Sequence, residues 1–437
     1  MDHMLWSWVL LGLALWGALW TAVALRPPRR PVHAIAITFF AAWLTTEMVL
    51  VHLAWQIVVV VVFIALGALD HWPGWVALAV TAVSWSGLVV IARAAARTDA
   101  RFANAFDTAL GPDWRDRIDP TIAPETTPRL QWGRVWMPFR FRRRGVERIR
   151  DLPYVDDGRR RHRLDVYRRS DAGPGAPVLL QIHGGGWVIG AKEQQGLPLM
   201  YHLAERGWVC VAINYRLSPR ATWPDQLIDC KHALRWIREH IAEHGGDPDY
   251  VVVTGGSAGG HLTTMVALTA NDPSYQEGFE SVDTSVRAMV PFYGVYDWTD
   301  RFGLRGARDP LRRLLERAVM KLPRDEAPER YADASPMNHL RPDTPPALVI
   351  HGSLDNLVPV DEARRFTTML ADTSECPVVY VELPGAHHAF DVFHSVRTLH
   401  AVAAVDAFLS WVLTVDPPAA SEARATPESR DAEVSSG

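Results

Sequence analysis

Residues 250–260 read YVVVTGGSAGG, and this stretch decides the fold that the sequence predicts. The run of β-branched residues is typical of a buried strand, and the apolar residues 260–270 that follow favour a helix. Between them, Gly255 and Gly259 flank Ser257 in a G-x-S-x-G pattern. A strand that turns this sharply into a helix strains the serine backbone and exposes its hydroxyl, while glycines avoid side-chain collisions. We therefore predict a nucleophile at Ser257.

Strands and helices alternate on both sides of this turn. The predicted strands cover residues 162–167, 177–182, 208–214, 288–292, 347–351 and 378–382, and longer helices cover 225–244 and 392–413. This order favours an α/β domain with a mostly parallel central sheet and helices on both faces. An insertion of about fifty residues follows Tyr293, so we expect residues of about 296–340 to cap the site.

A serine hydroxyl is a weak nucleophile, so it needs a base and an acid that orients the base. Asp355 lies one short loop past a predicted strand, in the sequence HGSLD, whereas the alternative acid Asp361 falls on the next helix. The last strand leads into LPGAHHAF, where His387 and His388 both fit the base. Spacing does not separate the two histidines, and the His-x-Phe pattern favours His388.

The sequence HGGGW at 183–187, after an apolar strand, predicts a loop whose backbone amides face a substrate carbonyl. Acyl transfer needs such N–H donors where negative charge develops. We assign them to Gly185 and Gly186 together with Ala258, the residue after the predicted nucleophile. Gly184 is expected to shape the turn, and His183 to be structural.

In that order, the motifs HGGGW, YRLSP, GGSAGG, HGSLD and HAF resemble the α/β-hydrolase fold and its hormone-sensitive-lipase-like carboxylesterases. With the apolar helices that precede it, the chain is most similar to the membrane-anchored carboxylesterases of actinobacteria. The resemblance spans residues 155–413 and implies a serine hydrolase that cleaves carboxylic esters through an acyl-enzyme. It also implies that no metal and no organic cofactor takes part.

The sequence departs from this family at two positions. Gly256 stands where the family commonly has an acidic residue, and Arg220 stands where it often has glutamate. The acid loop, with Val358 and Pro359 after the aspartate, also resembles peptidases of the prolyl-oligopeptidase type and formamidases. An amidase, peptidase or arylformamidase that uses the same triad is therefore an alternative, as is a non-catalytic membrane module that keeps the fold.

Charge and cysteine content exclude other classes. The 437 residues carry 45 Lys and Arg against 49 Asp and Glu, a net charge of −4, which gives no basic surface for nucleic acid. The three cysteines show no spacing typical of zinc or of a disulfide framework. We expect the partners to be a small-molecule or lipid ester and membrane lipids.

The composition of residues 1–92 predicts a membrane segment, since they hold nine of the 18 tryptophans and only six charged side chains. Apolar stretches at 5–25, 32–69 and 75–91 predict about three transmembrane helices, with residues 32–43 partly interfacial. Dividing the long middle stretch makes four spans, although no Gly or Pro marks a turn inside it. Glu47 and His52 lie within that stretch, and we expect them to make polar contacts between neighbouring helices or to lie near an interface.

The arginines predict the orientation of a multi-pass membrane protein. They flank the first and last apolar stretches and are absent from the loop at 70–74; they are Arg26, Arg29, Arg30, Arg93, Arg97 and Arg101. The positive-inside rule then places the N-terminus outside and the catalytic domain in the cytoplasm. A fourth span reverses this arrangement.

The remaining boundaries follow from composition. Residues 93–150 are expected to form a juxtamembrane basic and amphipathic linker, with a possible contribution to the cap. Its end, residues 134–150, carries seven arginines, which fit either an anionic leaflet or a solvated edge of the next domain. Residues 151–415 form the predicted catalytic domain, and residues 416–437 read as a disordered tail.

Overall fold

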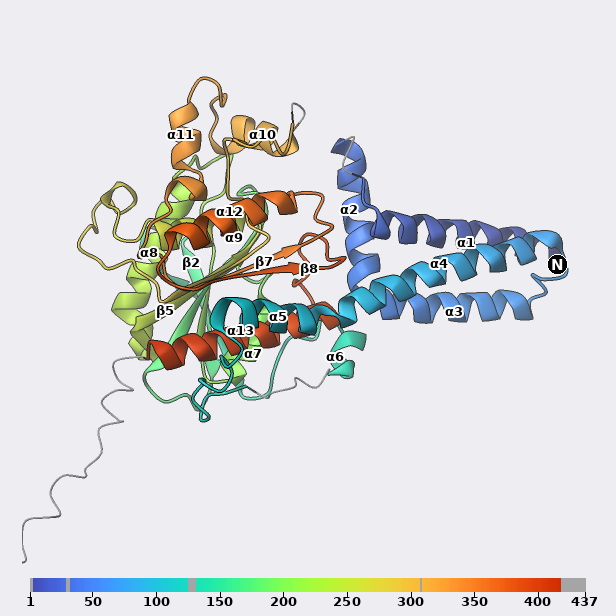
Figure 1. The fold of residues 1–437 in the computed structure, drawn as a ribbon, viewed down its shortest axis with the longest axis horizontal. Coiled ribbons are helices and arrows are strands. Elements are labelled where there is room, and N and C mark those ends of the chain that lie inside the picture. The colour runs from blue at the N-terminus through green and yellow to red at the C-terminus, as the bar shows by residue number, and fades with distance from the viewer. Residues whose placement is uncertain (1–2, 29–31, 125–130, 307–308, 418–437) are drawn as a thin grey trace, which may run out of the picture.

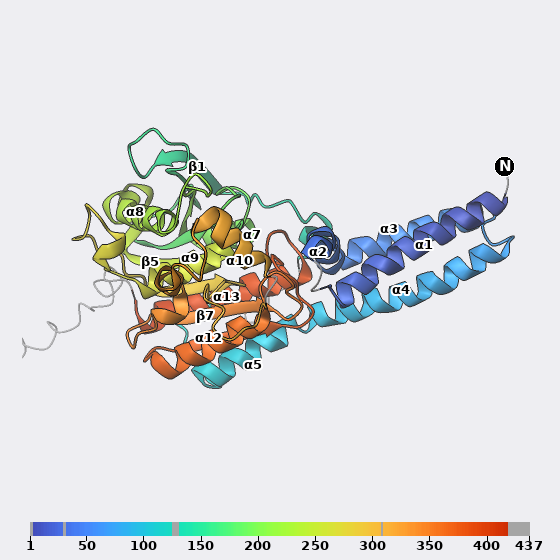
Figure 2. The ribbon, with the colours of Figure 1, turned by 90° about the horizontal axis from the view of Figure 1, so that it is seen from above.

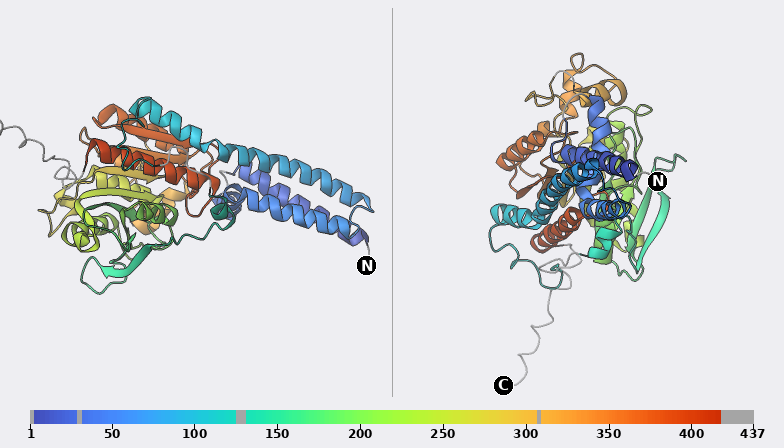
Figure 3. Two further views of the ribbon diagram at one scale, coloured as in Figure 1. Left: turned by 90° about the horizontal axis from the view of Figure 1, so that it is seen from below. Right: turned by 90° about the vertical axis from the view of Figure 1, so that its right-hand side faces the viewer.

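The computed structural model describes residues 3–28, 32–124, 131–306 and 309–417, with the side chains of 32–37 left aside. It consists of an α/β domain and a slender bundle of helices that projects from one end of it (Figures 1 and 3). The N-terminus lies at the far tip of the bundle (Figure 1). The predicted tail lies almost wholly outside the described residues.

Three apolar helices lie side by side in the bundle: α1 (His3–Leu25), α3 (Val49–Ala65) and α4 (Trp72–Ala96). The helix α2 (Val32–Glu47) precedes α3 and is turned by 90° at Met48, so that Figure 2 shows it end-on at the junction with the α/β domain. Large apolar side chains face outward from the bundle, among them Val58, Val61 and Val83, which are 61%, 59% and 73% exposed. A surface of this kind is typical of helices that contact lipid.

Polar side chains inside the bundle have partners. Thr21 Oγ1 and Ser84 Oγ lie 2.9 Å apart between α1 and α4, and Trp85 Nε1 donates to Gln56 Oε1 at 3.0 Å. Among the described residues, three helices are long and apolar enough to cross a membrane, or up to four if the bent α2–α3 pair counts as one span. One of the three, α13 (Val396–Val415), is largely buried in the α/β domain.

The central sheet has eight strands in the order β1-β2-β4-β3-β5-β6-β7-β8, of which the last six are parallel and β2 is antiparallel to both of its neighbours. The strands are β1 (Val146–Pro153), β2 (Arg163–Arg169), β3 (Ala176–Ile182), β4 (Val209–Ile213), β5 (Gly246–Gly256), β6 (Ala288–Phe292), β7 (Ala347–Gly352) and β8 (Val378–Leu383). This is the mostly parallel sheet that the sequence predicts.

Helices cover both faces of the sheet. On one face lie α8 (Asp225–His240), α9 (Ala258–Leu268) and α12 (Val360–Thr373), and on the other lie α5 (Thr98–Leu110), α7 (Leu197–Glu205) and α13 (Figure 1). Alternate side chains of β5 pack into the hydrophobic cores on the two faces of the sheet. Val251 and Val253 lie in the core of the first face, and Tyr250 and Val252 lie in the core of the second. The buried strand therefore reads as a continuous apolar run.

The segment 93–150 differs from the linker that the sequence suggests. Helix α5 continues from α4 and packs in the core, where the rings of Phe106 and Phe408 stack 6.4 Å apart. The basic stretch divides into the short helix α6 (Trp132–Trp136) and the edge strand β1, which pairs with β2. The α/β domain therefore begins before residue 151, because β1 is a strand of its sheet. Charged residues are common on such edge strands.

The insertion between β6 and β7 contains α10 (Pro310–Leu314), a π-helical turn (Leu315–Val319), α11 (Pro328–Asp333) and a 3₁₀ turn (Pro336–Asn338). In Figure 1 it lies above the sheet, with α10 on the side of α2. A Cβ placed on Gly186 would lie 3.1 Å from Leu314 Cδ2, so α10 lies against the glycine loop.

Candidate active site

Ser257 stands at the turn between β5 and α9. Its backbone has φ 60° and ψ −122°, a conformation that costs a non-glycine residue on the order of 1–3 kcal/mol. Its N–H donates to Phe292 O at 3.0 Å, which anchors the turn to β6. A Cβ on Gly259 would lie 2.2 Å from Ile182 O, so only glycine permits this close approach. The turn has the geometry that the G-x-S-x-G pattern predicts.

Asp355 and His388 form a direct pair at the carboxyl ends of β7 and β8. His388 Nδ1 donates to Asp355 Oδ2 at 2.7 Å, and the N–H groups of Leu357 and Val358 donate to Asp355 Oδ1 at 2.9 Å each. His351 Nε2 lies 3.2 Å from Oδ2. Burial alone would raise the pKa of Asp355, but the charge of His388 and the hydrogen bonds from both histidines hold it well below 3.8. The carboxylate is thus ionised and fixed.

The alternative residues lie elsewhere. His387 Nε2 donates to Ala24 O of α1 at 2.9 Å and faces the helical bundle. Asp361 is exposed on α12, where it pairs with Arg364 at 2.6 Å. The structure therefore pairs Asp355 with His388.

Tyr293 connects the serine turn to the histidine. Its ring centroid lies 4.6 Å from that of His388, and a Cβ on Gly256 would lie 2.5 Å from its hydroxyl oxygen. Among the described residues, none forms a hydrogen bond with the Ser257 hydroxyl. Such contacts in ligand-free sites are often long and tighten when substrate binds. The Tyr293 hydroxyl thus occupies the space beside Gly256, the position at which the resembled family commonly has an acidic residue.

A buried carboxyl group, Asp391, accepts a hydrogen bond from the Tyr293 hydroxyl. Burial raises the pKa of Asp391 above its usual value of 3.8. Sequence reasoning missed Tyr293, Asp391 and the contact of His351 with Asp355. The strand-end position of His351 is the one signal that was available, since carboxyl ends of parallel strands gather at one edge.

The glycine loop lies directly beside Ser257. A Cβ on Gly184 would lie 3.2 Å from Ser257 Cβ, and Gly185 and Gly186 adopt φ of +116° and +59°. Within the part of the chain that the structure describes, the N–H groups of Gly185, Gly186 and Ala258 have no protein acceptor. Free backbone donors that point toward one place are what an oxyanion hole requires, and these three lie beside the Ser257 turn.

His183 supports this loop. Its ring stacks on Tyr215 at 4.3 Å, and Nδ1 donates to Gly184 O at 2.7 Å. Tyr215 in turn donates to His183 O at 2.9 Å. His183 therefore has the structural surroundings that the sequence suggests, and Tyr215 shares them.

The helical bundle reaches the same site. The ring of Phe39 on α2 lies 6.3 Å from that of His388, and Asn356 Nδ2, next to Asp355, donates to Pro28 O at 3.3 Å. These contacts join residues more than 300 positions apart, so no local sequence pattern predicts them. The wall of the site is built from both parts of the chain.

Replacing Asp355 by asparagine is expected to lower kcat by about 10⁴-fold. The two loop amides that donate to Oδ1 fix the asparagine carbonyl in that place, which turns the NH₂ group toward His388 Nδ1. The imidazole then takes the wrong tautomer. Steady-state kinetics on a p-nitrophenyl ester measure the loss. Asp361→Asn is the matched control and should stay within about twofold of the wild type, because its ion pair is exposed; equal losses in both variants contradict the assignment.

Buried histidines near the site are expected to make the protein sensitive to acid. Burial lowers the pKa of His183 to about 4 and that of His261 to about 3, from an ordinary 6.5. As the pH falls, these histidines therefore take up protons in the unfolded chain before they do so in the folded protein. The free energy of unfolding is highest above pH 6.5 and falls as the pH drops toward the folded-state pKa values. At pH 5 the loss is about 2 kcal/mol per histidine. Thermal melts at pH 7.5 and 5 measure the drop. In His261→Gln the drop should be smaller, and an unchanged drop contradicts the role of His261.

The chain is similar to known esterases over most of its length. A family model described as BD-FAE matches residues 164–370. The chain is 45% identical over 410 residues to the probable carboxylic ester hydrolase LipM of Mycobacterium tuberculosis. This match covers 90% of each of the two chains. It is 42% identical to esterase LipQ of the same organism over 73% of this chain and 76% of that protein. Among solved structures, Thermogutta terrifontis esterase 2 phosphonylated by sarin matches with a TM-score of 0.51 at 25% identity, covering 63% and 97% of the two chains.

Fold and matches together define the class of protein as the esterases of the α/β-hydrolase fold. Within that class the chain belongs to the hormone-sensitive-lipase-like family that includes the mycobacterial Lip esterases. The resemblance drawn from the motifs is confirmed.

Proposed function

We propose that this protein is a membrane-anchored serine carboxylesterase. The observation that carries the proposal is the hydrogen bond between His388 and Asp355, at the same sheet edge as a strained serine turn with three free amides beside it. The descriptions of LipM as a probable carboxylic ester hydrolase and of LipQ as an esterase support the class of substrate.

The chemistry follows from these positions. Ser257 Oγ attacks the ester carbonyl carbon while its proton passes to His388 Nε2, and Asp355 stabilises the imidazolium. The oxyanion that forms accepts hydrogen bonds from Gly185, Gly186 and Ala258. When the tetrahedral intermediate collapses, the imidazolium protonates the departing alcohol and leaves an acyl-enzyme. Water, deprotonated by His388, then attacks the acyl carbon, and the carboxylic acid leaves as Ser257 regains its proton.

The serine mechanism is tested by covalent labelling. A fluorophosphonate probe should modify the purified full-length protein at Ser257, as located by peptide mass spectrometry, and should block hydrolysis of short acyl esters. The phosphonylated state of the Thermogutta terrifontis esterase supports this expectation. Hydrolysis that continues after complete labelling, or a label on another residue, contradicts the proposal. A protein that hydrolyses anilides but not esters favours an amidase instead.

Three features support a membrane anchor with the catalytic domain in the cytoplasm. The helices α1, α3 and α4 run along one axis, their outward faces are apolar, and the arginines gather at the end next to the α/β domain. The far loop between α3 and α4 carries no Lys or Arg. The positive-inside rule therefore favours three crossings with the N-terminus outside. The substrate is a small-molecule or lipid ester that reaches the site at the membrane surface.

Protease access tests this topology. Trypsin added to inverted membrane vesicles should digest the α/β domain, which is rich in arginine, whereas trypsin added to intact spheroplasts should leave it whole. The reverse pattern contradicts the orientation, and release of the full chain by alkaline carbonate contradicts the anchor.

A further inference from the structure

We propose that Glu47 on α2 and Arg397 on α13 act as a positioning pair, which holds the loop that carries His388 in its catalytic place. The helical bundle is then part of the active site as well as an anchor. This inference rests on the proposed function, since it assigns a role in presenting the base.

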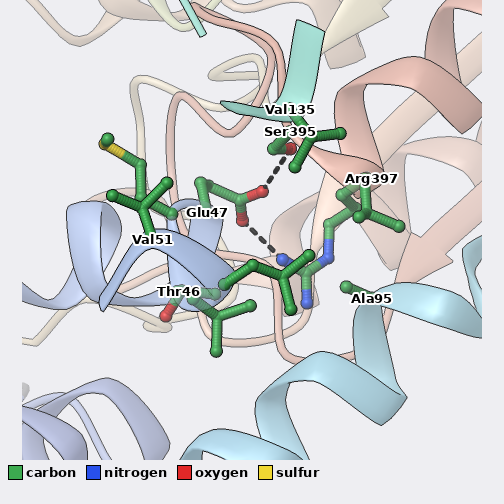
Figure 4. Close-up of a pocket in the computed structure, with 11 residues that line it drawn as sticks. Thr46, Glu47, Val51, Ala95, Val135, Ser395 and Arg397 are labelled. Carbon is green, nitrogen blue, oxygen red and sulfur yellow. Dashed lines mark hydrogen bonds and ion pairs between the residues drawn. The ribbon is translucent and has the colours of Figure 1, made fainter. Parts of the chain in front are cut away.

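The pair is buried where α2 meets the α/β domain (Figure 4). Arg397 Nη1 lies 2.5 Å from Glu47 Oε1, and Ser395 Oγ donates to Glu47 Oε2 at 2.8 Å. Glu47 is 5% exposed and Arg397 is fully buried. The free-energy cost of removing two charges from water offsets most of their mutual attraction, so a buried ion pair adds little net stability. The best-attested use of such a pair is to specify one arrangement of the elements that it joins.

The guanidinium of Arg397 also binds the loop itself. Its Nη2 donates to the carbonyl oxygen of Pro384 at 3.1 Å, and Pro384 is the first residue after β8. At the other end of the loop, Ser395 caps α13 by accepting from Thr398 N at 3.0 Å while it donates to Glu47. Glu47 is therefore connected to both ends of the loop 384–395, and His388 lies between them.

Other residues of the bundle contact the same loop. Ala24 O accepts from His387 Nε2, and the rings of Trp43 and Phe393 lie 5.1 Å apart. A Cβ on Gly385 would lie 3.4 Å from Ala94 Cβ of α4. Helices α1, α2 and α4 thus hold one side of the loop, with the Glu47–Arg397 pair as the charged contact among apolar and neutral ones.

The expected consequence is catalytic. A base displaced by about 1 Å can lower a rate by about 10²-fold, because proton transfer requires aligned atoms. Loss of the pair should therefore lower kcat and leave KM nearly unchanged. A purely structural pair would change the melting temperature and the yield of folded protein, but not kcat per active site.

The test uses the full chain in detergent, with active sites counted by the end point of fluorophosphonate labelling. Glu47→Gln and Arg397→Met should each lower kcat by roughly 30- to 100-fold, with KM within about threefold, and should slow labelling to the same degree. The double variant should lose no more than either single one, because the two side chains act as a unit. Gln56→Met is the matched control: it removes a polar contact inside the bundle, far from the loop, and should keep wild-type kcat.

The outcomes separate this inference from the proposed function. A wild-type protein that neither hydrolyses esters nor takes the label contradicts the proposed function. An active wild type with unchanged kcat per active site in both single variants overturns the positioning role alone, as do additive losses in the double variant. If the single variants do not fold, Glu47→Asp keeps the charge but draws it back by one methylene; an intermediate loss of kcat then supports the role, and wild-type kcat overturns it.

Discussion

Ser257→Ala is expected to lower kcat for short acyl esters on the order of 10⁶-fold. The variant loses the only atom that forms the acyl bond in the proposed mechanism, while the free amides beside it still bind the carbonyl. KM should therefore change little. Alanine accepts the same left-handed backbone at a similar cost, so the melting temperature should stay close to that of the wild type.

A matched control for this variant is Ser410→Ala. Ser410 is buried on α13 and donates to Ile122 O at 3.3 Å, far from the serine turn. Its loss should cost about 1 kcal/mol of stability and leave kcat unchanged. Stopped assays with high enzyme concentration measure the residual rate of Ser257→Ala. A rate above about one percent of the wild type contradicts the role of Ser257 as nucleophile.

His388→Ala is expected to lower kcat by a similar factor, on the order of 10⁶-fold, because serine without a base stays protonated at neutral pH. The same variant should take up fluorophosphonate far more slowly than the wild type, which separates loss of the base from loss of ester binding. Kinetics at several pH values and labelling time courses measure both effects.

His387→Ala is the comparison that decides between the adjacent histidines. This side chain is buried against α1 and donates to Ala24 O, so its loss should destabilise the protein by about 1–3 kcal/mol. Its effect on kcat should be at least 100-fold smaller than that of His388→Ala. If the two variants lose equal activity, the assignment of the base to His388 is wrong.

The site could be predicted where its residues follow one another closely in the chain. The turn at Ser257, the glycine loop and the loops after β7 and β8 each depend on strand ends and on a few neighbouring residues, and these local signals are strong. The roles of Ser257, Asp355 and His388 stay predictions that the variants above test. Tyr293 and Asp391 gave no such signal, because Tyr293 meets Asp391, His388 and Gly256 only after the strands β5 to β8 have assembled.

Two local features of the chain also misled or were silent. The arginines of VERIRDLP favour a basic linker at the membrane, whereas the structure places these residues in the edge strand β1. The 90° bend at Met48 has no Gly or Pro to mark it in the sequence. For Glu47 the sequence favours a polar contact between neighbouring helices or a place near an interface. Its partner in the structure is Arg397 on α13 of the α/β domain.

By itself, the order of residues determined the α/β architecture, the strained serine turn and the apolar character of the first 92 residues. Each of these depends on backbone sterics and on hydrophobic periodicity within one element, which act over a few residues. Only the tertiary structure decided which histidine meets Asp355, and that the bundle contacts the loop of His388. Those contacts join residues separated by 33 to 363 positions, and they form only where packing brings distant elements together.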